Sequence, residues 1–212
     1  NYIFSHKSIE DSVLMMKKGG YFKRGLLLKD VKNVRKESQK VLKKIVEFIN
    51  IINENFKNIH IVLRPHPTEN PDKWKKYIGY KKNIKIINSG NLGDWISNAL
   101  CVVHSGCTSG LEAAVRGKST ISITPKNIKY KYHGAKIPDM VSIKVQNKRQ
   151  IIKSITALTK KELKLDFKKN KKLVQNRIVN IFNKPAYKMI NETWEKIGND
   201  TLCNKNNNLL IM

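Results

Sequence analysis

Two short polar stretches contain residue types that can hold a negatively charged group. The first is Arg64-Pro65-His66-Pro67, which follows a β-branched run at residues 59–63. The two prolines hold the chain extended, so His66 loses little backbone entropy on binding, and its ring can donate a hydrogen bond or a proton to a phosphate. Arg64 can offer two parallel hydrogen bonds to the same group. A rigid loop with a solvated histidine is the alternative interpretation.

The second stretch, residues 104–112, reads His-Ser-Gly-Cys-Thr-Ser-Gly-Leu-Glu. Small residues at a strand-to-helix junction allow backbone N–H groups and hydroxyls to surround an anion at the positive end of the helix dipole. A capping box made by Ser109 and Glu112 explains the same residues without a ligand, and Cys107 is interpreted as a buried thiol. Neither the P-loop pattern nor the dinucleotide fingerprint is present. The candidate phosphate-binding residues are Ser105, Gly106, Thr108, Ser109 and Gly110, with Glu112 as the candidate for ribose hydroxyls.

Alternating short apolar runs and amphipathic segments position these stretches. The pattern predicts an α/β fold with a Rossmann-like parallel sheet and helices on both faces, which places both stretches at the carboxyl ends of strands, where ligands bind in such sheets. Asn70, Asn91 and Asn147 are the predicted N-caps, the last with Gln150 in a capping box. The predicted strands cover residues 59–63, 84–87, 101–104, 120–123 and 141–145, and the predicted helices cover 34–56, 71–78, 92–100, 109–116, 148–158, 168–182 and 185–197.

Length and composition predict one main domain. The 212 residues are enough for one ordinary core, and no run approaches the roughly 18 consecutive apolar residues that span a bilayer. We expect an irregular opening over residues 1–20, a Rossmann-like domain over 21–198 and a frayed tail over 199–212. Three cysteines without metal-ligand spacing indicate a reducing compartment, so we expect a cytoplasmic protein.

The chain carries 42 Lys and Arg against 16 Asp and Glu, a net charge of +26. Such an excess is typical of proteins that bind nucleic acid or anionic membranes. Lys, Asn and Ile together make up 85 residues, which is the composition of an AT-rich genome and explains most of this charge as a solvated lysine surface. The excess is +7 over residues 1–58, +5 over 59–125 and +14 over 126–212. The C-terminal excess is therefore the predicted membrane-facing surface, and no specific nucleic acid is expected.

The two polar stretches described above, with two shorter segments named below, resemble parts of the C-terminal half of a GT-B glycosyltransferase. More narrowly, they are similar to bacterial surface carbohydrate (capsule and lipopolysaccharide) biosynthesis proteins related to Kdo transferases. The resemblance covers about residues 35–145. The residues that carry it are Val62 to Glu69, Asp94-Trp95-Ile96, Ser105 to Ala113 and Gly117-Lys118.

The resemblance implies a domain that binds a nucleotide-sugar donor, with CMP-Kdo as the first choice. His66 would contact the donor phosphate and help the nucleotide leave, Thr108 and Ser109 would hold that phosphate, and Glu112 would reach the ribose. No Asp-x-Asp motif is present, so neither a metal nor another cofactor is expected. The resemblance also implies that residues 1–20 are a crossover from an N-terminal domain that supplies the catalytic base.

Several alternatives remain open. A CDP-glycerol-type glycerophosphotransferase and a UDP-N-acetylglucosamine 2-epimerase share similar halves. A non-catalytic basic module that binds nucleic acid or anionic lipid is the further alternative. For a glycosyltransferase we expect a glycan or lipid-linked acceptor, reached at the inner face of the cell membrane, where anionic lipids attract lysine clusters.

Overall fold

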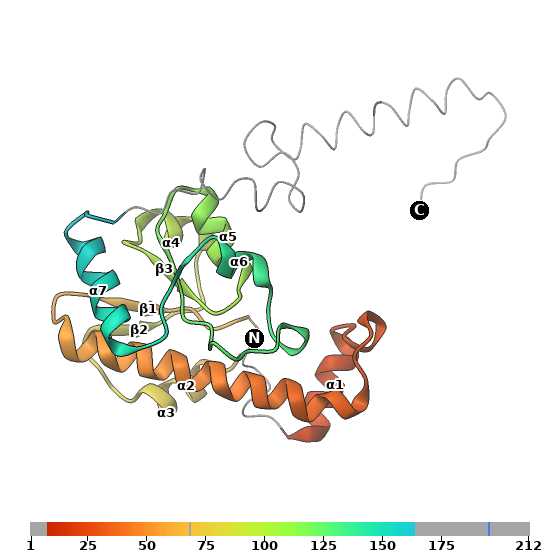
Figure 1. Cartoon of the computed structure of the whole chain (residues 1–212). Helices are drawn as coiled ribbons and strands as arrows, with labels where there is room; N and C mark the ends of the chain where they lie inside the picture. Colours follow the sequence, from red (N-terminus) through yellow and green to blue (C-terminus); the bar gives the residue numbers. More distant parts are fainter. Residues whose placement is uncertain (1–7, 68, 164–194, 196–212) are drawn as a thin grey trace. The chain divides into compact units, whose positions relative to one another are not determined.

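A computed structural model describes residues 8–67, 69–163 and 195 of the chain (Figure 1). Short parallel strands alternate with helices, so the α/β class expected from the sequence is confirmed. The predicted helices at 168–182 and 185–197 and the predicted tail at 199–212 lie outside the described residues, apart from Glu195. The elements in chain order are α1 (Ile9–Lys18), η2 (Phe22–Arg24), η3 (Leu28–Asp30), α2 (Val31–Asn55), β1 (Ile61–Leu63), α3 (Pro71–Ile78), β2 (Ile84–Ile86), α4 (Leu92–Asn98), β3 (Val102–His104), α5 (Thr108–Val115), β4 (Thr120–Ser122), η4 (Tyr130–Tyr132), α6 (Lys136–Met140), β5 (Ile143–Lys144) and α7 (Lys148–Thr159).

Residues 9–18 are helical where the sequence suggested irregular structure. Ser8 caps α1 by accepting a hydrogen bond from the Asp11 amide at 2.9 Å, and the helix ends before Gly19. Met16 of α1 packs with Leu26 and with the first turn of α2 in a small apolar cluster. This cluster attaches residues 9–30 to the N-terminal end of α2 (Figure 1).

The first sheet pairs β1 with β2 in parallel, with Ile61 opposite Ile84 and Leu63 opposite Ile86. Asn70 caps α3 and Pro71 occupies its first position, as the sequence predicts. The helix buries Trp74 and Ile78 against the middle of α2 and against the apolar side chains of both strands. Apolar packing of α2 and α3 therefore covers one face of this sheet.

The second sheet has the order β3-β4-β5, all parallel, with Val103 opposite Ile121. Helices α2 and α7 cover one face, where Ile121 and Ile123 join the largest apolar cluster. Successive side chains of a strand point to opposite faces, so His104 lies on the other face, against which α5 packs. A methyl group added at Gly110 of α5 would collide with the His104 ring, so only glycine allows this close approach.

The parallel strands expected from the sequence are present, but they form two sheets rather than one. Hydrogen bonds define two small parallel sheets, and none pairs β1 with β3 among the described strands. Both sheets nevertheless contribute to one apolar cluster, because Ile61 of β1 and Val103 of β3 both pack against the cluster that includes residues of α2 and α7. Within the described part of the chain, no helix combines the length and the apolar character needed to cross a membrane.

Candidate functional site

The loop after β1 presents His66 on a rigid base. Pro65 is buried and His66 is exposed. The carboxylate of Glu69, itself only 4% exposed, accepts hydrogen bonds from the His66 amide at 3.1 Å and from the Trp74 indole at 3.2 Å. Partial desolvation lowers the pKa of His66 below its ordinary value, so the neutral ring predominates at neutral pH. The sequence motif contains Glu69, yet its loop-fixing role could not be inferred without the position of Trp74.

The Arg64 side chain points to a different partner from the one expected. Its guanidinium donates to the backbone oxygens of Ser89 at 2.6 Å and Gly90 at 3.0 Å. It also lies 5.7 Å from the centre of the Trp95 ring, a cation–π contact. Arg64 therefore connects the loop after β1 to the loop before α4, and its two-pronged donor is already engaged by the protein backbone.

The loop after β3 directs Ser105 and Gly106 inward. The Gly106 amide donates to Asp139 at 3.2 Å, and the Gly106 oxygen accepts from the Ala135 amide at 2.9 Å. The Ser105 hydroxyl is 3.2 Å from that of Thr124 and 3.3 Å from Nε2 of His133. Ser105 and Gly106, which the sequence suggested as donor-phosphate contacts, are therefore buried, and their polar groups bond within the protein.

Thr108 and Ser109 begin α5, and here the structure corrects the predicted capping box. The N-cap is Cys107, which makes no side-chain cap bond and is exposed rather than buried. The Glu112 carboxylate instead pairs with Arg116 at 3.1 Å on the helix surface. The first amides of any helix lack partners within it. No hydrogen bond joins the Thr108 or Ser109 hydroxyl to another described residue, so this turn keeps its donors available.

A buried polar cluster supports the loop after β3, and it is centred on Asp139, a residue outside the sequence motifs described above. Asp139 is 1% exposed and accepts hydrogen bonds from Ser122 at 2.8 Å, Thr124 at 3.0 Å and Tyr130 at 2.6 Å, in addition to the Gly106 amide. Burial and the Asp139 carboxylate raise the pKa of Tyr130, so its hydroxyl keeps its proton. Polar residues at every second position of 120–124 were the sequence signal for this cluster.

His104 lies beside Asp139 in a defined tautomer. The single Ser142 hydroxyl proton is donated to the Pro138 oxygen at 2.6 Å, so the hydroxyl must accept from Nε2 of His104 at 2.8 Å. Nδ1 of His104 then lies 3.6 Å from an oxygen of Asp139. Burial lowers the pKa of His104 below its ordinary value, against the opposing effect of the Asp139 carboxylate. At neutral pH the ring is therefore neutral, and Nδ1 carries no proton.

His133 joins the loop after β3 to the segment that precedes α6. Its Nε2 lies 3.1 Å from the Ser105 oxygen, to which it donates when that nitrogen carries the proton. Burial lowers the pKa of His133 to about 4, although the bond to Ser105 and the charge of Asp139 act in the other direction. His104 and His133 are both buried, so their rings bond within the protein and are inaccessible to a ligand.

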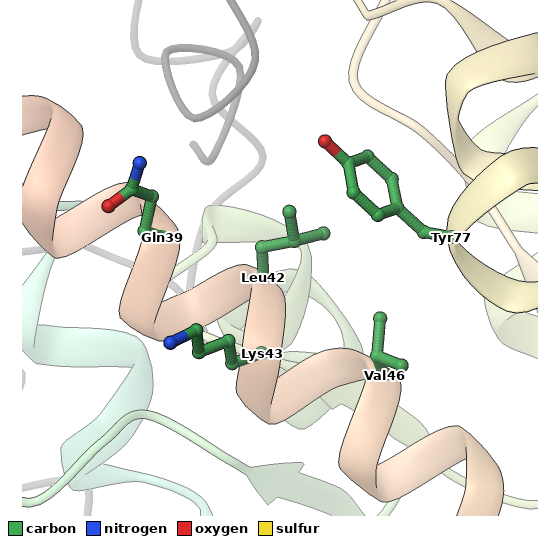
Figure 2. A pocket seen from close by; sticks show the side chains of 5 residues that line it. All are labelled: Gln39, Leu42, Lys43, Val46 and Tyr77. Atoms are coloured by element: carbon green, nitrogen blue, oxygen red, sulfur yellow. The ribbon is translucent and has the colours of Figure 1, made fainter.

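Two shallow pockets lie away from both loops. One, of about 530 Å³, lies between α2 and α3, where Leu42 and Val46 point toward Tyr77 while Lys43 points away from it (Figure 2). The other, of about 540 Å³, lies on α7 beside Lys148, Arg149 and Lys153. Neither contains a predicted site residue. Within residues 8–67 and 69–163, no cluster of three His, Cys, Asp or Glu side chains is placed to hold a metal ion.

Comparisons with protein families, with curated proteins and with solved structures find no match for this chain. A functional assignment therefore depends on the motifs and on the geometry of the two loops.

Proposed function

We propose that this chain binds a nucleotide-sugar donor as one domain of a metal-independent GT-B glycosyltransferase, with CMP-Kdo as the first-choice donor. The reaction belongs to bacterial surface polysaccharide biosynthesis in this proposal. The single observation that carries it is the start of α5. There Thr108 and Ser109 begin the helix that follows β3 after the short loop of residues 105–107, and their donors are not engaged by other described residues.

The Asp139 cluster supports this role because it fixes the preceding residues. Buried hydrogen bonds to Asp139 and His133 fix Gly106 and Ser105, so the first turn of α5 has a defined position before a ligand binds. Such a preorganised set of N–H and hydroxyl donors stabilises a phosphate that gains charge as the sugar leaves. Gly110 contributes by allowing α5 to lie directly on His104.

His66 is the proposed second contact with the donor phosphate. It is exposed at the end of β1 on a loop held by Glu69 and Arg64. In the proposed inverting displacement, the acceptor hydroxyl attacks the anomeric carbon while the bond to the nucleotide phosphate breaks. The neutral His66 ring would donate a hydrogen bond to that phosphate. The base that removes the acceptor proton is proposed to belong to an N-terminal domain.

Glu112 remains the proposed partner of the ribose hydroxyls. Its present partner Arg116 is about half exposed, and such surface ion pairs contribute little free energy. A ribose could therefore replace Arg116 at small cost.

Nucleotide titration by calorimetry tests the proposal. CMP is expected to bind more tightly than CDP or UDP; preference for CDP would favour a CDP-glycerol-type transferase, and preference for UDP an epimerase-like enzyme. His66→Ala and Ser109→Ala are each expected to weaken binding about tenfold or more, the loss expected for a hydrogen bond to a charged group. The matched controls are His60→Ala and Ser97→Ala, which alter exposed residues outside the two loops. A folded sample that binds no nucleotide would refute the proposal.

A further inference from the structure

The turn between α1 and α2 exposes two adjacent leucines. Leu26 is buried, whereas Leu27 is 53% exposed and Leu28 is 66% exposed. We call this pair the Leu27–Leu28 tip. Isolated exposed leucines are ordinary on protein surfaces, but two neighbours on one turn form an apolar projection. The turn lies at the N-terminal end of α2 (Figure 1).

Hydrogen bonds fix the turn that carries the tip. The Leu27 amide donates to the Asp30 carboxylate at 2.9 Å, and the Asp30 amide donates back to the Leu27 oxygen at 2.8 Å. The other oxygen of Asp30 accepts from the Tyr132 hydroxyl at 2.9 Å. The two leucines are thus presented by a preformed turn, so little conformational entropy is lost when their side chains are covered.

From position 12 to position 46, every exposed charged residue is positive. Asp30 and Glu37 are the only acidic residues from position 12 to position 46, and both are buried. Lys23, Arg24 and Lys29 are exposed within the turn itself. Further exposed lysines lie close in sequence, at the end of α1 and in the first turns of α2: Lys17, Lys18, Lys32 and Lys36.

We propose that the Leu27–Leu28 tip inserts into the interfacial region of an anionic lipid bilayer while the surrounding basic side chains contact its headgroups. Apolar side chains flanked in sequence by exposed Lys and Arg match such a surface, because long basic side chains reach the headgroup level while the apolar groups enter the acyl boundary. A protein partner fits less well, since lysine is depleted at protein–protein interfaces. This inference is independent of nucleotide binding.

Vesicle co-sedimentation of the full chain tests the proposal. The vesicles contain phosphatidylcholine alone or phosphatidylcholine with phosphatidylglycerol, in 0.1 M or 0.5 M NaCl. The test variant is Leu27→Ser with Leu28→Ser, which removes apolar surface without changing charge. The matched control is Tyr80→Ser with Leu100→Ser, which removes two exposed apolar side chains elsewhere. Circular dichroism verifies that each variant is folded.

We expect the parent to bind the anionic vesicles and to retain part of that binding in 0.5 M NaCl. The Leu27→Ser/Leu28→Ser variant is expected to bind about tenfold or more weakly, and its residual binding to disappear at high salt, while the control binds like the parent. Equal binding by both double variants would overturn the proposal, as would parent binding that vanishes in 0.5 M NaCl. The proposal would also be overturned if the parent did not bind lipid but formed a dimer that the two leucine substitutions converted into a monomer. That result would show that the Leu27–Leu28 tip contacts a second copy of the chain.

Discussion

At the residue scale, the buried carboxylate of Asp139 organises the loop after β3. It accepts hydrogen bonds from three hydroxyls and one backbone amide, and these donors belong to β4, to the segment after β4 and to the loop itself. A buried charge is tolerated when several donors replace its lost hydration. Removing the acceptor would leave these buried donors without a partner, so Asp139 should matter to the stability of the domain.

We therefore predict that Asp139→Ala lowers the free energy of unfolding by about 3 kcal/mol, the usual cost of breaking a buried charged network. Urea denaturation followed by circular dichroism measures the change. The control is Asp72→Ala, because Asp72 lies on the surface and pairs there with Lys75. If both variants lower the urea midpoint of unfolding equally, the hydrogen bonds of Asp139 do not stabilise the loop after β3.

The buried histidines predict a dependence of stability on pH. The pKa of His133 is about 4 in the folded protein and near 6.5 in the unfolded chain, so between these values the unfolded state binds more protons. Stability is therefore complete above about pH 6.5 and falls as the pH decreases toward 4. His104 contributes in the same direction.

Urea unfolding at several pH values from 7 to 4.5 measures this slope. His133→Gln keeps a side-chain N–H for the Ser105 oxygen but does not titrate, so its slope is expected to be smaller than that of the parent. Exposed His60 serves as the control, and His60→Gln is expected to leave the slope unchanged. A parent whose stability rises on acidification would contradict this prediction.

At the element scale, the helix starts differ in their capping. The side chains of Asn70, Asn91 and Asn147 accept hydrogen bonds from backbone amides two or three residues later. Gln150 completes only part of the predicted capping box, because its side chain accepts from the Gln146 amide rather than from Asn147. Cys107 of α5 makes no such bond, so this helix alone among the four relies on other groups at its start.

This contrast predicts different costs for equivalent substitutions. Asn70→Ala and Asn147→Ala are each expected to reduce the free energy of unfolding by about 1 kcal/mol, because each leaves a backbone amide unpaired. Cys107→Ala is the matched comparison, and it is expected to change the free energy of unfolding by only about 0.3 kcal/mol or less, because Cys107 makes no cap bond. Chemical denaturation measures all three. A loss at Cys107 as large as at the asparagines would show that its thiol caps α5.

At the scale of the whole molecule, the net charge of +26 opposes the compact state through mutual repulsion. The ion pairs Lys75–Asp72 and Arg116–Glu112 are largely exposed and offset little of this repulsion. Salt screens such repulsion over distances beyond about 10 Å at 0.1 M.

We therefore predict that the melting temperature rises when NaCl increases from 0.02 to 0.5 M. Differential scanning calorimetry measures the shift, and the same titration with an uncharged osmolyte separates screening from general solvent effects. A melting temperature that falls with NaCl would indicate that the few attractive pairs outweigh the repulsion.

The local features were predictable because each depends on residues near in sequence. The N-caps at Asn70, Asn91 and Asn147 and the alternation of strands and helices over residues 34–123 followed from the spacing of apolar, capping and proline residues. Helix α6 was not predicted, because the sequence suggested a loop before Pro138. Irregular structure over residues 9–18 was a wrong expectation, because Ser8 caps α1 and the apolar residues Val13 and Met16 pack in a cluster. The division into two sheets depends on hydrogen bonds between strands, which strand-forming residues alone do not specify.

The α/β class and the two polar loops at strand ends could be predicted from the amino-acid sequence, because each depends on residues that are close together in the chain. Which residues of these loops point inward depends on the packing of distant segments. The Asp139 carboxylate accepts a hydrogen bond from the Gly106 amide, 33 positions away in the sequence. The Arg64 guanidinium donates to carbonyl oxygens 25 and 26 positions along the chain. Buried polar groups must find hydrogen-bond partners wherever the fold brings them, and those partners are set by packing rather than by neighbouring residues. Among the predicted site residues, Thr108 and Ser109 begin α5 with hydroxyls that bond to no other described residue.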